Sequence, residues 1–147
     1  SGKGLCAVDA LTGNELWKNN SWSQREGTTV TLSLSPNEKI LISGVQWGAM
    51  YANDALTGKL LWSKSENGIR NRASSPAMFQ DGMYFLSLNS LFILSSRTGE
   101  ILLQKELPYS VDVTSTPLVT KEEIIFGTAT EGLVALDRNT LDEIPYR

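Results

Sequence analysis

Hydrophobic residues are grouped in short runs along the chain, and residues that favour turns bound each run. The runs over 39–45, 83–88 and 124–128 are rich in β-branched and aromatic residues, which favour strands. Pairs such as Asp81-Gly82 and Thr98-Gly99 separate the runs and are typical of tight turns. No long stretch has the 3.6-residue periodicity of an amphipathic helix. The pattern therefore predicts an all-β chain.

The same pattern recurs at a nearly constant interval. Four segments align without a gap, with spacings of 45, 41 and 42 residues measured at Ala7, Ala52, Ile93 and Ala135. A period of about 40 residues with about four strands in each unit is typical of β-propeller blades. We therefore expect blades of four antiparallel strands, which we name A to D in chain order.

About three and a half such blades fit the 147 residues. We expect a single propeller segment over 1–147, with a half-blade at 1–19 and blades at 28–66, 73–106 and 113–147. The half-blade supplies only strands C and D, at 4–9 and 14–19. The other expected strands are 28–34, 39–45, 48–54 and 59–64, then 73–79, 83–88, 91–95 and 100–106, then 113–119, 124–128, 132–137 and 141–146.

The repeated segments share a set of fixed residues that have structural roles. A glycine at the C–D turn allows a positive φ, and an aspartate four residues earlier can accept backbone N–H bonds across that turn. A small alanine keeps the blade thin, and a tryptophan buries a large area. These residues are Ala7, Asp9, Gly13 and Trp17 in the first segment, Ala52, Asp54, Gly58 and Trp62 in the second, Gly99 alone in the third, and Ala135 and Asp137 in the fourth. The fourth segment has Leu141 for the glycine and Pro145 for the tryptophan.

These residues resemble the PQQ-type propeller repeat, whose hallmark is Ala-x-Asp-x-x-x-Gly-Lys-x-x-Trp. The second segment matches it at every fixed position, Lys59 included, and the first has Asn14 for the lysine. Ser75-Pro76 and Thr116-Pro117 resemble a further family feature of strand A. The family includes quinoprotein dehydrogenases and non-catalytic relatives such as the outer-membrane assembly scaffold lipoprotein. The resemblance implies that each tryptophan docks on the adjacent blade, and that the chain is periplasmic or extracellular, although it does not open with a signal peptide.

Composition and charge exclude several classes of function. A net charge of −3 does not suggest a nucleic-acid surface, and the short apolar runs do not predict a membrane span. The chain has no histidine, which excludes Ser-His-Asp and Cys-His catalysis and His-ligated zinc within it. Its one cysteine, Cys6, aligns with Tyr51, Phe92 and Val134, so we expect it to be buried in the core.

The resemblance also bears on cofactors. An active quinoprotein of this family would need an acidic Ca²⁺ cluster, a catalytic aspartate and usually a pair of adjacent cysteines beside the cofactor. The chain has one cysteine, and its acidic residues are mostly of turn or surface type. We therefore expect no cofactor, no metal and no enzymatic activity in this chain.

The connections from strand D to strand A carry the candidate binding residues. Propellers bind ligands where these loops converge, and arginine with aromatic residues is the mixture enriched at binding hot spots. The candidates for a ligand or partner surface are Trp22, Arg25, Arg70, Arg72, Tyr109 and Asp112. The alternative is that the aromatic residues pack under the blades and the arginines pair with nearby acids.

Three functions remain open at this point. The first is a non-catalytic binding or scaffold propeller within a larger extracytoplasmic bacterial protein. The second is a fragment of a PQQ-dependent quinoprotein dehydrogenase, and the third is an accessory propeller fused to a hydrolase domain outside this chain.

A partial propeller also leaves blade faces uncovered, since propellers close with about four to eight blades. We expect a protein partner, the remaining blades of the same propeller or another copy to cover them, through Leu5, Ala7 and Trp17 or through Leu118, Ile125 and Leu133. The alternative is that residues near the C-terminus supply strands A and B of the first blade.

Overall fold

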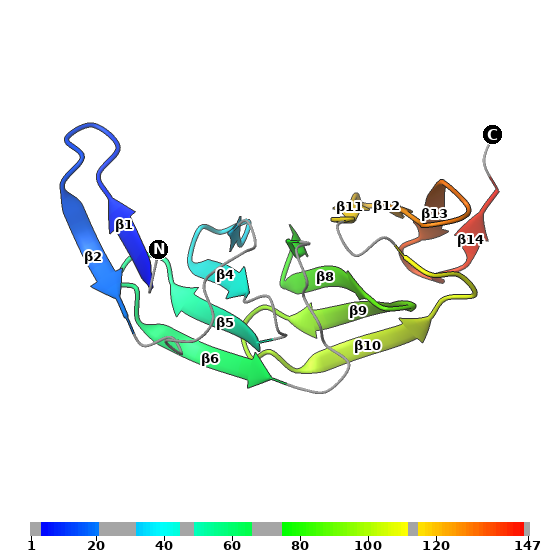
Figure 1. The fold of residues 1–147 in the computed structure, drawn as a ribbon, viewed down its shortest axis with the longest axis horizontal. Coiled ribbons are helices and arrows are strands. Elements are labelled where there is room, and N and C mark those ends of the chain that lie inside the picture. Colours follow the sequence, from blue (N-terminus) through cyan, green and yellow to red (C-terminus); the bar gives the residue numbers. More distant parts are fainter. Residues whose placement is uncertain (1–3, 21–31, 45–48, 66–74, 112–114, 146–147) are drawn as a thin grey trace.

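The computed structural model describes residues 4–20, 32–44, 49–65, 75–111 and 115–145. These residues form strands and turns without a helix, which confirms the all-β prediction. Consecutive sheets follow one another along an open arc, with β1 and β2 at one end and β14 at the other (Figure 1). The chain is therefore a partial propeller of about three blades. No helix within the described residues is long and apolar enough to cross a membrane.

The strands form one two-stranded and three four-stranded antiparallel sheets in which neighbours along the chain are paired. We call the two-stranded sheet the half-blade and the others blades 2, 3 and 4. The half-blade contains β1 (Leu5–Val8) and β2 (Glu15–Asn19). Blade 2 contains β3 (Ser33–Leu34), β4 (Ile40–Gly44), β5 (Ala49–Asp54) and β6 (Leu60–Ser65). Blade 3 contains β7 (Ala77–Phe79), β8 (Gly82–Ser87), β9 (Ser90–Ser95) and β10 (Ile101–Glu106). Blade 4 contains β11 (Leu118–Val119), β12 (Glu123–Gly127), β13 (Leu133–Asp137) and β14 (Glu143–Ile144).

The A strands of blades 3 and 4 are shorter than the sequence predicted. Each begins immediately after a proline, Pro76 before β7 and Pro117 before β11. Proline has no N–H to donate to a neighbouring strand, so regular pairing starts only after it. The segments around these prolines instead link successive blades: the Ser33 hydroxyl donates to the Pro76 carbonyl at 2.6 Å, and the Ser75 N–H donates to Oγ1 of Thr116 at 3.2 Å.

The hydrophobic core lies between successive blades. We call the face of a blade that turns toward the next blade its front face, and the opposite face its back face. The front face of blade 2 contributes Ile42, Met50 and Ala52 to a buried cluster with four residues from the back face of blade 3: Met83, Phe85, Phe92 and Leu94. The rings of Phe85 and Phe92 stack with centroids 5.2 Å apart. Similar clusters join the half-blade to blade 2 and blade 3 to blade 4.

The prediction that Cys6 is buried was wrong, because the residue is exposed. Cys6 and Val8 lie on the back face of the half-blade, and Val8 is 56% exposed. The aligned residues Phe92 and Val134 are buried because a preceding blade covers them, and no described sheet covers this face of β1. The repeat correctly places Cys6 within a blade, but a residue at this position is buried only where a neighbouring blade packs on it.

The prediction that Leu5, Ala7 and Trp17 of the half-blade lie at an uncovered surface was also wrong. Leu5 is buried and packs with Trp17 against blade 2, so these residues, with Ala7 on the same strand pair, belong to an internal junction. The alternative residues in blade 4 do lie on a front face that no described sheet covers, where Leu118 is 61% and Leu133 is 58% exposed.

In blade 4, the pairing of strands C and D is shifted by one residue relative to the pairing in the half-blade and blade 2. In the half-blade and blade 2, strands C and D have a bulge that places Trp17 opposite Ala7 and Trp62 opposite Ala52. Blade 4 pairs Ala135 with Ile144 and has no such register shift. Ile144, and not Pro145 as the sequence alignment predicted, therefore stands at the tryptophan position.

Candidate protein-binding surface

The aspartates of the repeat accept hydrogen bonds within their own C–D turns. Oδ1 of Asp54 accepts the N–H of Leu56 at 3.0 Å and of Thr57 at 2.8 Å, and it also accepts the Thr57 hydroxyl at 2.9 Å. Asp9 and Asp137 accept the corresponding backbone bonds in their own turns. In the third turn the hydroxyl of Ser95 accepts two longer bonds of 3.3 Å.

These bonds stabilise the ionised carboxylates. The Thr57 hydroxyl first, and then the backbone N–H of Thr57, lower the pKa of Asp54 below its ordinary value. The backbone N–H of Thr12 is the main cause that lowers the pKa of Asp9, and that of Thr140 lowers the pKa of Asp137. The repeated aspartates are therefore charged turn residues that accept hydrogen bonds from the backbone N–H groups of their own turns.

The tryptophans join one blade to the next through these turns. Gly58 has a φ of +71°, and its buried position lies directly under the indole of Trp17. The Trp17 indole N–H donates to the carbonyl of Ala55 at 3.1 Å, and the Trp62 indole N–H donates to that of Ser96 at 2.9 Å. Each indole thus packs on a glycine of the next blade and donates to the carbonyl three residues before it.

The junction between blades 3 and 4 uses different side chains in the same places. Leu103 lies opposite Ile93, in the register of the tryptophans, and Leu141 takes the glycine position with a φ of +62°. Leu141 is buried in the cluster against which Leu103 packs. Lys105 Nζ donates to the Leu141 carbonyl, as the side-chain amide of Asn19 donates to that of Gly58.

Five of the six candidate surface residues lie outside the described residues: Trp22, Arg25, Arg70, Arg72 and Asp112. Tyr109 is described, and it lies in the connection from β10 to β11. Its ring is half-buried and meets Phe126 of blade 4 with centroids 6.5 Å apart. Burial first, and then the charges of Glu143 and Glu131, raise the pKa of Tyr109 above its ordinary value. The structure therefore places one candidate, and it lies beside two carboxylates that the sequence did not single out.

The connection that carries Tyr109 is held against the B–C turns of two blades. The N–H of Leu107 donates to the Asn89 carbonyl at 2.7 Å. The N–H of Ala129 donates to the Ser110 carbonyl at 3.1 Å, and Val111 pairs with Thr128. D-to-A connections and B–C turns therefore form a common rim of the arc at this point.

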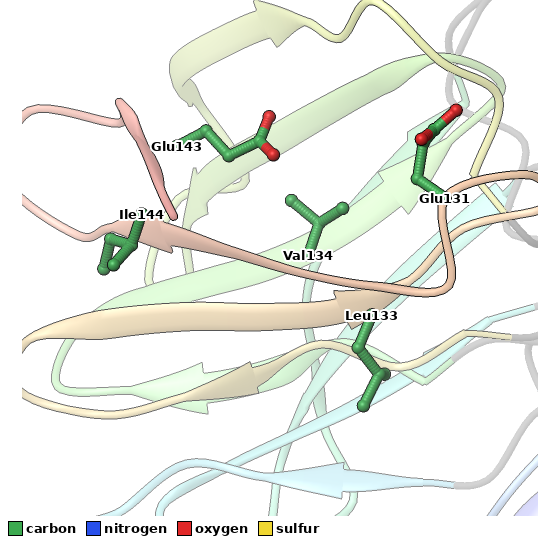
Figure 2. A pocket seen from close by; sticks show the side chains of 5 residues that line it. All are labelled: Glu131, Leu133, Val134, Glu143 and Ile144. Carbon is green, nitrogen blue, oxygen red and sulfur yellow. The ribbon is translucent and has the colours of Figure 1, made fainter. Parts of the chain in front are cut away.

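A hollow of about 490 Å³, open to solvent, lies in blade 4 near this rim. Val134 points into the space between the carboxylates of Glu131 and Glu143, while Leu133 points away from it (Figure 2). The two glutamates belong to a turn and to β14, twelve residues apart, and neither belongs to the repeated motif. Sequence reasoning missed them because only the fold brings them together. Among the described residues, no group of three or more acids, cysteines or histidines is placed to hold a metal ion.

The fold and the repeated turn define the class of protein: these are blades of a PQQ-type β-propeller. The family model described as "Outer membrane protein assembly factor BamB" matches residues 1–144, and the chain belongs to this family. No curated protein matches the chain.

Several solved structures share the fold. BamB from Moraxella catarrhalis superposes on the whole chain with a TM-score of 0.73 and 19% identity. The chain spans 46% of that protein's length. The computationally designed Ika4 protein matches 92% of this chain and 80% of its own, with a TM-score of 0.69 and 21% identity. The quinohemoprotein alcohol dehydrogenase from Comamonas testosteroni matches 80% of this chain and 20% of its own, with a TM-score of 0.62 and 20% identity.

Proposed function

We propose that the chain is part of a non-catalytic scaffold propeller that binds other proteins in the periplasm or outside the cell. The observation that carries this proposal is the family match over residues 1–144, whose description names an outer membrane protein assembly factor. The proposed role is the same kind of assembly, within a bacterial protein longer than this chain. The blades are those read from the repeat: 1–19, 28–66, 73–106 and 113–147.

The geometry of the described residues supports a binding role. The acids of the repeat accept hydrogen bonds from their own turns, and the tryptophans hold the blades together. The described D-to-A connection, from β10 to β11, lies against the B–C turns of two blades. In the sequence, the D-to-A connections carry arginines and aromatic residues of the kind enriched at binding hot spots. The proposed partner surface is the set Trp22, Arg25, Arg70, Arg72, Tyr109 and Asp112.

The test is genetic and uses the full-length protein in its own bacterium. Deletion of the gene is expected to lower the amounts of folded outer-membrane proteins, and the wild-type gene restores them. The double variant Arg70→Glu, Arg72→Glu is expected not to restore them. Arg97→Glu is the matched control, because Arg97 is an exposed arginine in a C–D turn, where its side chain forms an ion pair of 3.2 Å with the exposed Asp81.

Two results would contradict the proposal. Unchanged outer-membrane proteins in the deletion strain would refute the assembly role, and full rescue by the double variant would refute the surface. The second candidate is a quinoprotein dehydrogenase, favoured by the shared fold with the alcohol dehydrogenase. Titration with PQQ and Ca²⁺ separates the two, because a shift in quinone absorbance together with a rise in melting temperature would favour the dehydrogenase.

A further inference from the structure

The turn between β8 and β9 carries an exposed leucine in an unfavourable backbone conformation. Ser87 pairs with Ser90, so Leu88 and Asn89 form a two-residue B–C turn. Leu88 has a φ of +58°, a region that favours glycine or asparagine and strains a bulky residue. Its side chain is 54% exposed, although the serines on both sides of the turn are buried. Backbone strain of this kind is concentrated at functional sites, which makes the turn a candidate for one.

Packing within the fold does not account for the leucine. Glu38 and Gln80 also have positive φ values, of +59° and +53°, but both are polar residues of A–B turns, at the other end of the blades. Leu141 has a positive φ too, and it is buried in the junction between blades 3 and 4. Within the described part of the chain, Leu88 is therefore the one apolar residue that combines a positive φ with an exposed side chain.

The exposure of Leu88 is not that of an uncovered blade face. It belongs to blade 3, which lies between blades 2 and 4 and packs against both of them (Figure 1). Its turn projects from the end of the blade, at the rim where the connection from β10 to β11 passes. The position of Leu88 is thus set by contacts on both sides of its blade.

The connection from β10 to β11 fixes the turn at both of its residues. The Val111 N–H donates to the Leu88 carbonyl at 3.3 Å, and the Leu107 N–H donates to the Asn89 carbonyl at 2.7 Å. The side-chain amide of Asn89 donates to Oε1 of Glu106 at 3.1 Å. The leucine is therefore presented by a backbone that is already ordered, which reduces the entropic cost of binding.

The surface around Leu88 is acidic. We define the blade 3–4 rim as residues 88–89, 106–111 and 128–132. The rim contains Glu106 and Glu131 and no lysine or arginine. Glu106 is bonded to the turn itself, and Glu131 lies close enough to Tyr109 to act on its charge. An apolar side chain among carboxylates is complementary to an apolar pocket with cationic groups at its edge.

We propose that Leu88 is an anchor of the partner-binding surface, and that it enters an apolar pocket of a partner protein with lysine or arginine at the edge of the pocket. This inference rests on the proposed scaffold function, to which it adds an anchor residue and the chemistry of the partner. Burial of the exposed half of the leucine contributes to affinity, and the cationic groups complement Glu106 and Glu131.

Photo-cross-linking from position 88 tests the contact in the cell. The full-length protein carries p-benzoylphenylalanine at position 88 and is irradiated in its own bacterium. The control carries the same residue at position 80, where Gln80 is exposed with a positive φ at the other end of the blade. We expect an intermolecular adduct from position 88 alone, and mass spectrometry should place it at apolar residues flanked by lysine or arginine. No intermolecular adduct from position 88, an adduct within the same chain, equal adducts from both positions, or an adduct site without cationic residues would overturn the proposal.

Rescue of the deletion strain separates this inference from the proposed function. Leu88→Asn removes the apolar side chain but tolerates the positive φ, so its melting temperature should stay within about 2 °C of the wild type. It is expected to weaken partner binding by about tenfold or more, and to restore the outer-membrane proteins less well than the matched control Gln80→Asn. A fall of many degrees in the melting temperature would show that Leu88 supports the fold, which overturns the anchor role.

The two possible failures are distinguishable. Equal rescue by Leu88→Asn and Gln80→Asn would refute the anchor and leave the scaffold function standing. Unchanged outer-membrane proteins in the deletion strain would refute the scaffold function, and the adduct from position 88 would then still decide whether Leu88 contacts a partner.

Discussion

The indole of Trp17 lies so close to Gly58 that a side chain there has no room: a Cβ on Gly58 would be 2.3 Å from Cε3 of Trp17. Trp62 stands in the same relation to Gly99 in the next blade, with a corresponding distance of 2.8 Å. The glycine therefore serves two purposes, because it allows the positive φ of the turn and leaves space for the tryptophan of the preceding blade.

The two purposes can be separated with a pair of substitutions. Gly13→Ala should cost only the strain of placing an L-residue at positive φ, roughly 1–2 kcal/mol, because nothing lies within 4 Å of its Cβ. Gly58→Ala should add roughly 1–3 kcal/mol for overpacking against Trp17. Urea unfolding in dilute solution measures both free energies of unfolding. Equal losses would show that the contact with Trp17 does not restrict the turn.

Replacing a tryptophan tests the other side of the same contact. Trp62→Ala should lower the free energy of unfolding by about 3–5 kcal/mol, because it leaves a cavity and removes the bond to the Ser96 carbonyl. Trp22→Ala is the comparison, since the sequence places Trp22 in a D-to-A connection, and it should cost less. A comparable loss from both variants would contradict the loop position expected for Trp22.

The fold was predictable from the sequence because one motif recurs with its turn glycine and its aspartate. The repeat assigns each residue a position within a blade, and the all-β blades follow from it. It does not say whether a neighbouring blade covers that position, and for this reason Cys6 was expected in the core although it is exposed. It also did not reveal that blade 4 lacks the bulge before its tryptophan position, which shifts Ile144 into that place.

The candidate site was less predictable. Tyr109 was predicted as a candidate because it lies in a D-to-A connection. The other five candidates lie outside the described residues and stay predictions. Glu131 and Glu143 carry no motif and come together only through the pairing of β13 with β14 and the turn before β13. Such a grouping depends on tertiary contacts, and a repeat pattern contains no information on it.

The junction between blades 3 and 4 should respond to an exchange of two residues together. Leu141→Gly relieves the positive φ of +62° but leaves a space beside Leu103, so alone it should destabilise the chain. Leu103→Trp alone should be overpacked against Leu141. The double variant restores the pair seen at Trp17 and Gly58, so we expect a favourable coupling energy of about 1–3 kcal/mol in a double-mutant cycle. Strict additivity would show that the two sites are independent.

The turn aspartates should make stability depend on acid pH. Asp54 has a lowered pKa in the folded chain, so its contribution is present above the unfolded pKa of about 3.9 and is lost as pH falls through the folded value. The urea midpoint should therefore fall as pH is lowered below about 4. Asp54→Asn keeps an acceptor oxygen but not the charge, and Thr57→Val removes the hydroxyl donor. Both should reduce this pH dependence, and an unchanged slope in Asp54→Asn would contradict the assignment.

The buried amide of Asn53 should be replaceable by an apolar side chain. Asn53 is fully buried on the back face of blade 2, at the position that Leu94 and Leu136 hold in blades 3 and 4. Its Nδ2 donates to the Gly58 carbonyl at 3.0 Å, but its Oδ1 is buried without a partner.

The Gly58 carbonyl does not depend on Asn53 alone, because the side chain of Asn19 also donates to it, at 2.6 Å. Asn53→Leu therefore removes an unsatisfied acceptor and leaves the carbonyl bonded, so we expect stability to be unchanged or raised by about 1 kcal/mol. Asn53→Asp, of nearly the same shape, should destabilise strongly because it buries a charge without a cation. A large loss in Asn53→Leu would show that the amide is required at this junction, and combining it with Asn19→Ala would reveal whether the carbonyl of Gly58 is the reason.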